Sequence, residues 1–279
     1  MIFSIAMLED YRRYPIGIQN FEQLRNNDCV YVDKTELVYR LTHTDQVYFL
    51  SRPRRFGKSL LVSTLEAYFQ GKKDLFRGLA MERLEQDWES YPVLHIDFSI
   101  SKYLSAHYLR SAINWFLERW EREYGCCVED KKGTPFSVRL GNVIESAYKK
   151  TGKAVVVLVD EYDSPMLDTN SDVALQGELR GIMRDFFSPL KGMGQYLRFL
   201  FITGISKFSQ MSIFSELNNL QNISMRDDFS AICGTPEEAL AQIDSKQYAV
   251  PYQADGRRVV KVGVNFDSAT RTIGEWIVR

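Results

Sequence analysis

The tripeptide Gly57-Lys58-Ser59 stands between a short apolar stretch and an amphipathic one, and this arrangement restricts the fold more than any other feature of the chain. Residues 46–50 predict a strand that runs into the tripeptide. Residues 58–70 predict a helix that leaves it and stops at Gly71, with an apolar face formed by Leu61, Leu65, Tyr68 and Phe69. A strand, a loop and a helix in this order are typical of a phosphate-binding loop, in which backbone N–H groups at the start of the helix point at phosphate oxygens.

Each residue of the tripeptide suits one part of that task. Gly57 lets the backbone approach a phosphate closely, Lys58 brings a cation to the β- and γ-phosphates, and Ser59 offers a hydroxyl to Mg²⁺. The general pattern also has an earlier glycine, where this chain has Arg52, and a left-handed backbone at that position would be costly for a residue with a Cβ. The tripeptide alone is often a coincidence, so a nucleotide site needs a second element.

The second element is the apolar run at residues 154–159, which Asp160 and Glu161 follow directly. A run that is apolar on both faces and too short to span a membrane suits a strand covered by helices on each side. Carboxylates at its C-terminal end lie where open α/β sheets bind ligands, so Asp160 is a candidate for the Mg²⁺ shell and Glu161 for polarising the attacking water. A buried strand that ends in acidic turn residues is the alternative, but its combination with the phosphate loop favours nucleotide binding.

Further motifs continue in unbroken order from about residue 12 to residue 240. They lie at residues 14–18 (YPIGI), 31–35 (YVDKT), 51–59 (SRPRRFGKS), 159–165 (VDEYDSP), 203–209 (TGISKFS), 213–219 (IFSELNN) and 232–234 (ICG). Together they resemble the bacterial AAA-ATPase-like family of P-loop proteins. The string at residues 51–59 is specific to that family, so the absent first glycine is a family trait. The resemblance implies an ATPase fold with additional strands between the phosphate loop and the Asp-Glu strand, and it says little about the biological role.

The resemblance also implies a set of site residues. ATP would be contacted by the loop and by the end of a later strand, through Arg54, Arg55, Phe56, Gly57, Lys58, Ser59, Leu60 and Thr203. Ser59 and Asp160 would hold Mg²⁺, and catalysis would depend on Lys58 and Glu161.

Several of these assignments have alternatives. Either Thr203 or Ser206 would sense the γ-phosphate, unless the hydroxyls merely cap a strand end. Arg54 and Arg55 would contact phosphate, solvent or a partner subunit. His43, His95 and His107 are scattered along the chain, and we expect each of them to be structural.

Composition restricts the partners and the compartment. A formal net charge of −1 gives no global attraction to nucleic acid or to an anionic membrane, and no apolar run is long enough to span a bilayer. The first eight residues are apolar but lack a basic start, so no secretion signal is predicted. The cysteines have no metal-ligand spacing, which predicts reduced thiols and a cytoplasmic protein: Cys29, Cys126, Cys127 and Cys233. The sequence does not decide whether the protein forms a homo-oligomer.

Periodicity predicts the rest of an α/β fold. Further strands are expected at residues 93–98 and 198–203, and helices at residues 104–124, 138–150 and 175–190. Strands that alternate with helices indicate a P-loop NTPase architecture, with a mostly parallel sheet flanked by helices.

The C-terminal end departs from the ATPase pattern. A helix start is predicted at residues 235–238 (TPEE), followed by strands at residues 259–266 and 272–278. These strands resemble the closing β-hairpin of the PD-(D/E)XK nuclease-like domain that follows the ATPase in this family. The metal-binding half of that domain is missing between them, and the only Glu-x-Lys, Glu129-Asp-Lys131, falls in a polar loop. The sequence therefore predicts that the nuclease part has been lost, as an internal deletion would produce.

These observations divide the chain into an AAA-ATPase-like domain at residues 1–240 and a tail at residues 241–279. The predicted function is hydrolysis of ATP with Mg²⁺. Two alternatives stay open: a nucleotide-dependent binding or switch module with little turnover, and a non-functional deletion product of an ATPase–nuclease. A small-molecule kinase fits less well, because nothing downstream of the Asp-Glu pair resembles a lid.

Overall fold

A five-stranded, all-parallel sheet forms the centre of the protein. The computed structural model describes residues 15, 17–126, 128–131, 133–169, 172–205, 213–214, 217, 219–233, 262–267 and 272–278. The strands of the sheet are β1 (Val47–Ser51), β2 (Val93–Asp97), β3 (Val155–Asp160), β4 (Leu197–Gly204) and β5 (Gln221–Asn222). Their order across the sheet is β2-β3-β4-β1-β5. The predicted parallel α/β sheet is thus confirmed.

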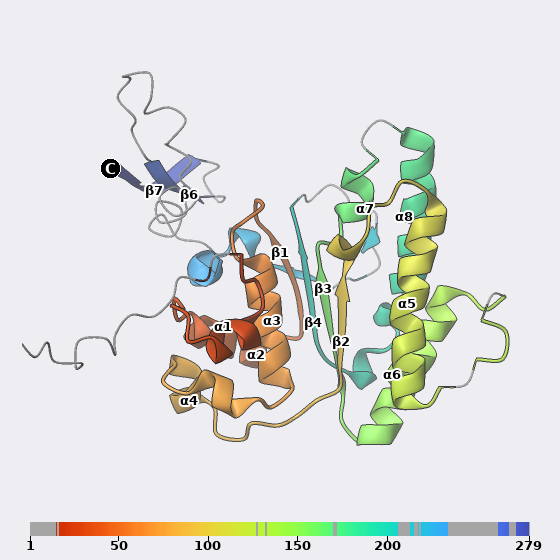
Figure 1. Ribbon diagram of the computed structural model, residues 1–279, viewed down its shortest axis with the longest axis horizontal. Helices are drawn as coiled ribbons and strands as arrows, with labels where there is room; N and C mark the ends of the chain where they lie inside the picture. The colour runs from red at the N-terminus through yellow and green to blue at the C-terminus, as the bar shows by residue number, and fades with distance from the viewer. Residues whose placement is uncertain are drawn as a thin grey trace, which may run out of the picture.

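Helices cover both faces of this sheet (Figure 1). One face carries α1 (Phe21–Asn26), α2 (Thr35–Thr44), α3 (Lys58–Phe69) and α4 (Ala80–Leu84). The other face carries α5 (Ala106–Tyr124), α6 (Phe136–Thr151) and α8 (Val173–Phe187), and the short α7 (Ser164–Leu167) follows β3. Short 3₁₀ turns complete the described chain: η2 (Lys73–Phe76), η3 (Phe98–Ile100), η4 (Ser188–Lys191), η5 (Gly194–Tyr196), η6 (Ile223–Met225) and η7 (Asp227–Ile232).

The sheet separates two hydrophobic cores. Successive side chains of a strand point to opposite faces, so β3 contributes to both cores. Val155, Val157 and Val159 pack with α5, α6 and α8, whereas Val156 and Leu158 pack with α3 and its neighbours. The continuous apolar run of the sequence therefore reflects burial on both faces, as expected for a parallel strand.

The end of α8 differs from the prediction. The sequence predicted a helix to residue 190, but α8 ends at Phe187 and the chain continues as the 3₁₀ turn η4. Pro189 is the physical reason, because it has no backbone N–H to continue the α-helical hydrogen bonds. The apolar face of α8 and η4 is nevertheless buried along its whole length: Leu179, Ile182, Met183, Phe186, Phe187 and Leu190.

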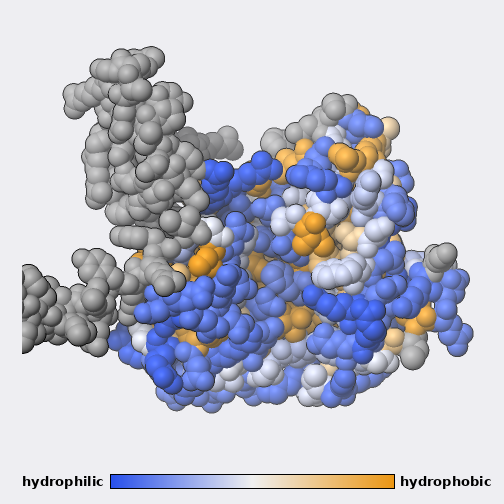
Figure 2. Space-filling view, viewed as in Figure 1, coloured by the Kyte–Doolittle hydropathy of each residue, from blue (hydrophilic) through white to orange (hydrophobic). Residues whose placement is uncertain are grey.

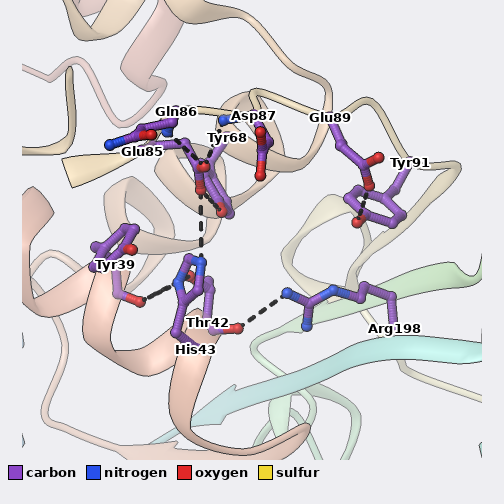
Figure 3. A network of polar contacts seen from close by, with 10 residues as sticks. All are labelled: Tyr39, Thr42, His43, Tyr68, Glu85, Gln86, Asp87, Glu89, Tyr91 and Arg198. Atoms are coloured by element: carbon purple, nitrogen blue, oxygen red, sulfur yellow. Dashed lines mark hydrogen bonds and ion pairs between the residues drawn. The ribbon is translucent and has the colours of Figure 1, made fainter. Parts of the chain in front are cut away.

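A polar network lies at the edge where the strands of the sheet begin (Figure 3). The Glu85 carboxylate accepts a hydrogen bond of 2.5 Å from the Tyr68 hydroxyl, and His43 Nε2 lies 3.7 Å from it. Arg198, in the second position of β4, donates to the carbonyl of Thr42 at 3.2 Å. Open α/β sheets bind ligands at the opposite edge, so we assign this network a structural role.

Strands β6 (Val262–Asp267) and β7 (Thr272–Val278) pair antiparallel in a separate two-stranded sheet, with an irregularity between Val264 and Phe266. The connection at residues 268–271 lies outside the described residues, so the hairpin stays a prediction. The helix start predicted at residues 235–238 also lies outside them.

The visible surface of the described chain is mostly hydrophilic, with hydrophobic residues in small separate areas (Figure 2). Among the described helices, none combines the length and the apolar character needed to cross a bilayer.

Candidate functional site

The loop between β1 and α3, which the sequence predicts to bind phosphate, has left-handed residues, but none of them is at Arg52, the position of the first glycine in the general pattern. Gly57 has a φ of 77° and Arg55 a φ of 68°, whereas Arg52 is not among the described residues with positive φ. A Cβ on Gly57 would meet no atom within 4 Å, so glycine is required there by the backbone angle and not by space. The cost expected for Arg52 in the first glycine position is therefore avoided.

Lys58 is the buried cation of this loop. Its side chain is only 4% exposed, and Nζ donates to the carbonyls of Arg52 at 3.1 Å and Pro53 at 2.9 Å. Burial lowers the pKa of the Lys58 amine, and the carboxylates of Asp160 and Glu161 act in the opposite direction. The strand order puts the loop after β1 and the end of β3 on the two sides of β4, at the same edge of the sheet.

Thr203, at the end of β4, holds Asp160 at the end of β3. Asp160 is 3% exposed and Thr203 is fully buried, and the Thr203 hydroxyl donates to Asp160 Oδ1. The backbone N–H of Glu161 donates to the same oxygen at 3.1 Å. The Asp160 carboxylate is thereby fixed in orientation through one of its two oxygens.

Glu161 has a strained backbone and a restrained side chain. Its φ is 49°, which is uncommon for a residue with a Cβ and typical of functional sites. Its N–H also lies 3.3 Å from Thr203 Oγ1, and the Ser164 hydroxyl donates to Glu161 Oε2 at 3.1 Å. The turn therefore presents a half-buried carboxylate next to Asp160.

The turn after β3 also contacts the end of β4 through Tyr162, Asp163 and Gly204. The sequence patterns alone assigned none of these three residues a role. Asp163 is 1% exposed, and its Oδ2 accepts a hydrogen bond of 2.8 Å from the N–H of Ile205. A Cβ on Gly204 would lie 2.3 Å from the ring of Tyr162, so only glycine fits at the end of β4. The sequence held a signal for this contact, because both motifs follow apolar strands that a parallel sheet brings to one edge.

The remaining predicted residues lie on the same loop with different exposure. Arg54 and Arg55 are exposed, whereas Phe56, Ser59 and Leu60 are half-buried. Ser206 lies outside the described residues. Strand β4 lies between β1 and β3, with Leu50 in register with Thr203, so Thr203 lies between the phosphate loop and Asp160.

The donor set of this edge fits a magnesium nucleotide. A buried amine and the N-terminus of a 12-residue helix suit phosphate oxygens, and the Ser59 hydroxyl with the Asp160 carboxylate supplies the oxygen ligands that Mg²⁺ prefers. Mg²⁺ in such sites keeps water and phosphate ligands, so it does not require a cluster of protein carboxylates. Indeed, a group of three or more His, Cys, Asp or Glu side chains able to hold a metal is not found in the described part of the chain.

A relative of this chain comes from Azotobacter chroococcum mcd 1, where it is named "Uncharacterized protein in vnfD 5'region". The two are 40% identical over 228 residues, which is 81% of this chain and 43% of the relative. The match therefore covers less than half of the relative's length. No solved structure matches.

Two family models match consecutive parts of the chain. The PD-(D/E)XK nuclease superfamily matches residues 216–276, which supports the resemblance of the C-terminal strands to the end of that nuclease-like domain. The family described as predicted AAA-ATPase matches residues 15–214, which include the phosphate loop, the Asp160-Glu161 turn and Thr203. The chain therefore belongs to the predicted AAA-ATPase family.

Proposed function

We propose that this protein binds ATP with Mg²⁺ at the C-terminal edge of its sheet and hydrolyses it. The observation that carries the proposal is the buried Lys58 amine, which is hydrogen-bonded within the loop. The negative charges of Asp160 and Glu161 raise its pKa, against the effect of burial. A buried cation is costly without a partner, so this amine is suited to a strongly anionic ligand. Family membership supports nucleotide binding by the same loop.

The proposed roles follow from the chemistry of each side chain. Lys58 and the N-terminus of α3 bind the β- and γ-phosphates, with Arg54, Arg55, Phe56, Gly57 and Leu60 as the remaining contacts of the loop. Ser59 and Asp160 hold Mg²⁺, which neutralises phosphate charge when bound. Glu161 accepts a proton from the attacking water.

Thr203 has a narrower proposed role than a γ-phosphate sensor. Its hydroxyl donates to Asp160 Oδ1. This bond supports a role in orienting the carboxylate toward the metal shell. Direct contact of Thr203 with the γ-phosphate would require the hydroxyl to give up that bond.

A nucleotide-dependent switch is the second candidate, and one contact favours it. The Ser164 hydroxyl donates to Glu161 Oε2 at 3.1 Å, so this oxygen already has a hydrogen-bond partner and is less available to an attacking water. A glutamate held in this way would bind nucleotide normally and turn it over slowly.

We also propose a boundary near residue 240 between the ATPase domain and the tail. Residues of β5 and of the segment after it pack into the ATPase core, since Ile223, Phe229 and Cys233 are buried there. This packing extends beyond residue 216, where the nuclease-like match begins. Loss of the nuclease activity and a cytoplasmic location remain parts of the proposal.

Turnover of ATP by the full chain, with and without added DNA, tests the proposal. Glu161→Gln should lower turnover by about 10²–10⁴-fold and leave ATP affinity nearly unchanged, because the amide cannot accept the proton. Asp160→Asn should weaken Mg²⁺-dependent binding as well as turnover. Glu145→Gln, at a half-exposed glutamate of α6 that pairs with Lys149, serves as the matched control.

Two outcomes would contradict the hydrolase assignment. Normal turnover by Glu161→Gln would remove the proposed base. Tight ATP binding by the wild type without turnover in any condition would favour the switch.

A further inference from the structure

The segment after β5 is bonded directly to the start of the phosphate loop. Ser224 Oγ accepts a hydrogen bond of 2.7 Å from the N–H of Ser51, the last residue of β1. The Arg52 guanidinium donates to the carbonyl of Ser224 at 2.7 Å. Ser224 is 3% exposed, and its own N–H is held by the Asn222 side chain at 3.0 Å. Ser224 is therefore buried and fixed by hydrogen bonds where it meets the loop.

Arg52 contacts the segment at the place where other phosphate loops have a glycine. Its guanidinium is half-buried, and burial lowers its pKa, while the nearby Cys233 side chain acts in the opposite direction. Cys233 also acts on the pKa of Lys58. The phosphate loop thus lies close to both Ser224 and Cys233, near the two ends of the segment at residues 223–233.

The backbone of Arg52 adjoins the proposed nucleotide site, whereas its side chain points to Ser224. Its carbonyl accepts a hydrogen bond from Lys58 Nζ at 3.1 Å, and its N–H donates to the carbonyl of Gly204 at 3.1 Å. One residue therefore joins the lysine that would bind phosphate, the end of β4 and the segment after β5. A glycine in this position would keep the backbone bonds and lose the contact with Ser224.

Nucleotide in this loop would change the bonds at this residue. Lys58 would turn its amine from the carbonyls of Arg52 and Pro53 to the phosphates, and these carbonyls would then need new partners. The peptide that loses this bond carries the side chain anchored on Ser224. A rearrangement of the loop would therefore alter the contact of Arg52 with the segment after β5.

We propose that the bonds of Ser51 and Arg52 to Ser224 together couple the phosphate loop to residues 223–233, so that this segment responds to bound nucleotide. The inference rests on the proposed function, because it requires nucleotide in the loop. Residues 223–233 lie within the match to the PD-(D/E)XK superfamily, which begins at residue 216. The coupling would thus carry the nucleotide state from the ATPase site toward the region that follows it.

Hydrogen exchange measured by mass spectrometry on the full chain tests the coupling. The probe is a non-hydrolysable ATP analogue with Mg²⁺, and a peptide covering residues 57–62 reports binding independently of the segment. In the wild type, saturating analogue should change amide exchange in residues 221–233 by about tenfold, within the usual range of coupling between two sites.

Arg52→Met keeps the apolar stem of the side chain and removes its donors, and Ser224→Ala removes the acceptor of the Ser51 N–H. With the analogue bound, both variants should keep the protection of residues 57–62 and lose most of the change in residues 221–233. Arg52→Lys restores the charge and one donor, so it should recover part of the response. Arg77→Met, at an exposed arginine paired with Asp74, should respond like the wild type.

Several outcomes would overturn the coupling. One is a wild type that binds the analogue without any change in residues 221–233. Another is a full response in Arg52→Met, or in Ser224→Ala if the first variant does not fold. A wild type that gives no calorimetric signal with ATP and no protection of residues 57–62 would overturn the proposed function, and the coupling with it.

Discussion

At the scale of single residues, the site depends on charges that the fold partly removes from water. Lys58 and Asp160 are both almost fully buried, and the interaction between them opposes the effect of burial on the pKa of Lys58. Such groups keep their charges only where partners or ligands compensate for lost hydration. Substitutions here should therefore affect ligand binding more than stability.

Lys58→Ala tests this expectation. The change removes a charge-assisted contact of about 1.5–3 kcal/mol, so ATP affinity should fall by roughly ten- to a hundredfold. The fold should survive, because the variant also removes a buried cation. Titration calorimetry together with thermal unfolding measures both effects, and Lys72→Ala, a half-exposed lysine paired with Glu22, is the control. Unchanged ATP affinity in a folded Lys58→Ala protein would refute the phosphate-loop assignment.

The pair formed by His95 and Glu66 predicts a pH dependence of stability. His95 Nδ1 lies 2.9 Å from Glu66 Oε2, between β2 and α3. Burial lowers the pKa of His95, but the hydrogen bond and charge of Glu66, helped by Asp160 and Asp97, raise it above 6.5 overall. The contribution of His95 is therefore complete below pH 6.5 and lost as the pH rises through the raised pKa.

Glu66 has the opposite dependence. Burial raises its pKa, yet the bond from His95 and nearby positive charges lower it below 4.5 overall, so its contribution is present above pH 4.5 and lost on acidification. Urea unfolding of the wild type should show a loss of stability above pH 6.5 that His95→Gln reduces. His107→Gln, on the exposed face of α5, should keep the wild-type profile. An identical loss in His95→Gln would show that other groups cause it.

At the scale of elements, the long periodic helices and the apolar strands could be predicted within about three residues, because each buries a regular stripe or run. The expected strand at residues 198–203 is β4 (Leu197–Gly204), and the expected helix at residues 138–150 is α6 (Phe136–Thr151). Short elements such as α1 and β5 escaped prediction. Six and two residues are too few to show a period, and β5 exists only through its pairing with β1.

The junction of β4 with the turn after β3 gives an element-scale prediction. A Cβ on Gly204 would lie 2.3 and 2.6 Å from two atoms of the buried Tyr162 ring. Gly204→Ala should therefore lower the free energy of unfolding by about 1–3 kcal/mol through overpacking, and it should disturb turnover by moving the Glu161 turn. Denaturant unfolding and ATP turnover measure the two effects.

Gly181 offers the matched control. It lies on the exposed side of α8, where a Cβ would meet no atom within 4 Å. Gly181→Ala should raise the free energy of unfolding by about 0.5–1 kcal/mol. With alanine the unfolded chain has less conformational entropy than with glycine, so less entropy is lost on folding. Equal stability changes in the two variants would contradict the steric argument.

At the scale of the whole molecule, the ATPase core and the C-terminal strands form separate sheets. A two-stranded sheet alone is marginally stable in water, and its free edges favour pairing with other chains. Removal of residues 245–279 should therefore leave ATP affinity unchanged and improve solubility. Calorimetry and the concentration limit of the purified protein test this, and a large loss of ATP binding would make the tail an integral part of the fold.

The sequence by itself determined the class of fold and the candidate chemistry, because both depend on local patterns. Gly57-Lys58-Ser59 and the apolar run before Asp160 each predict their own element and its functional edge. Contacts between distant segments needed the tertiary structure. The bonds of Thr203 to Asp160, Asp163 to Ile205 and Arg52 to Ser224 join segments more than 40 residues apart, and no local period encodes them. The order of the strands, which places β4 between β1 and β3, decided which of these side chains meet.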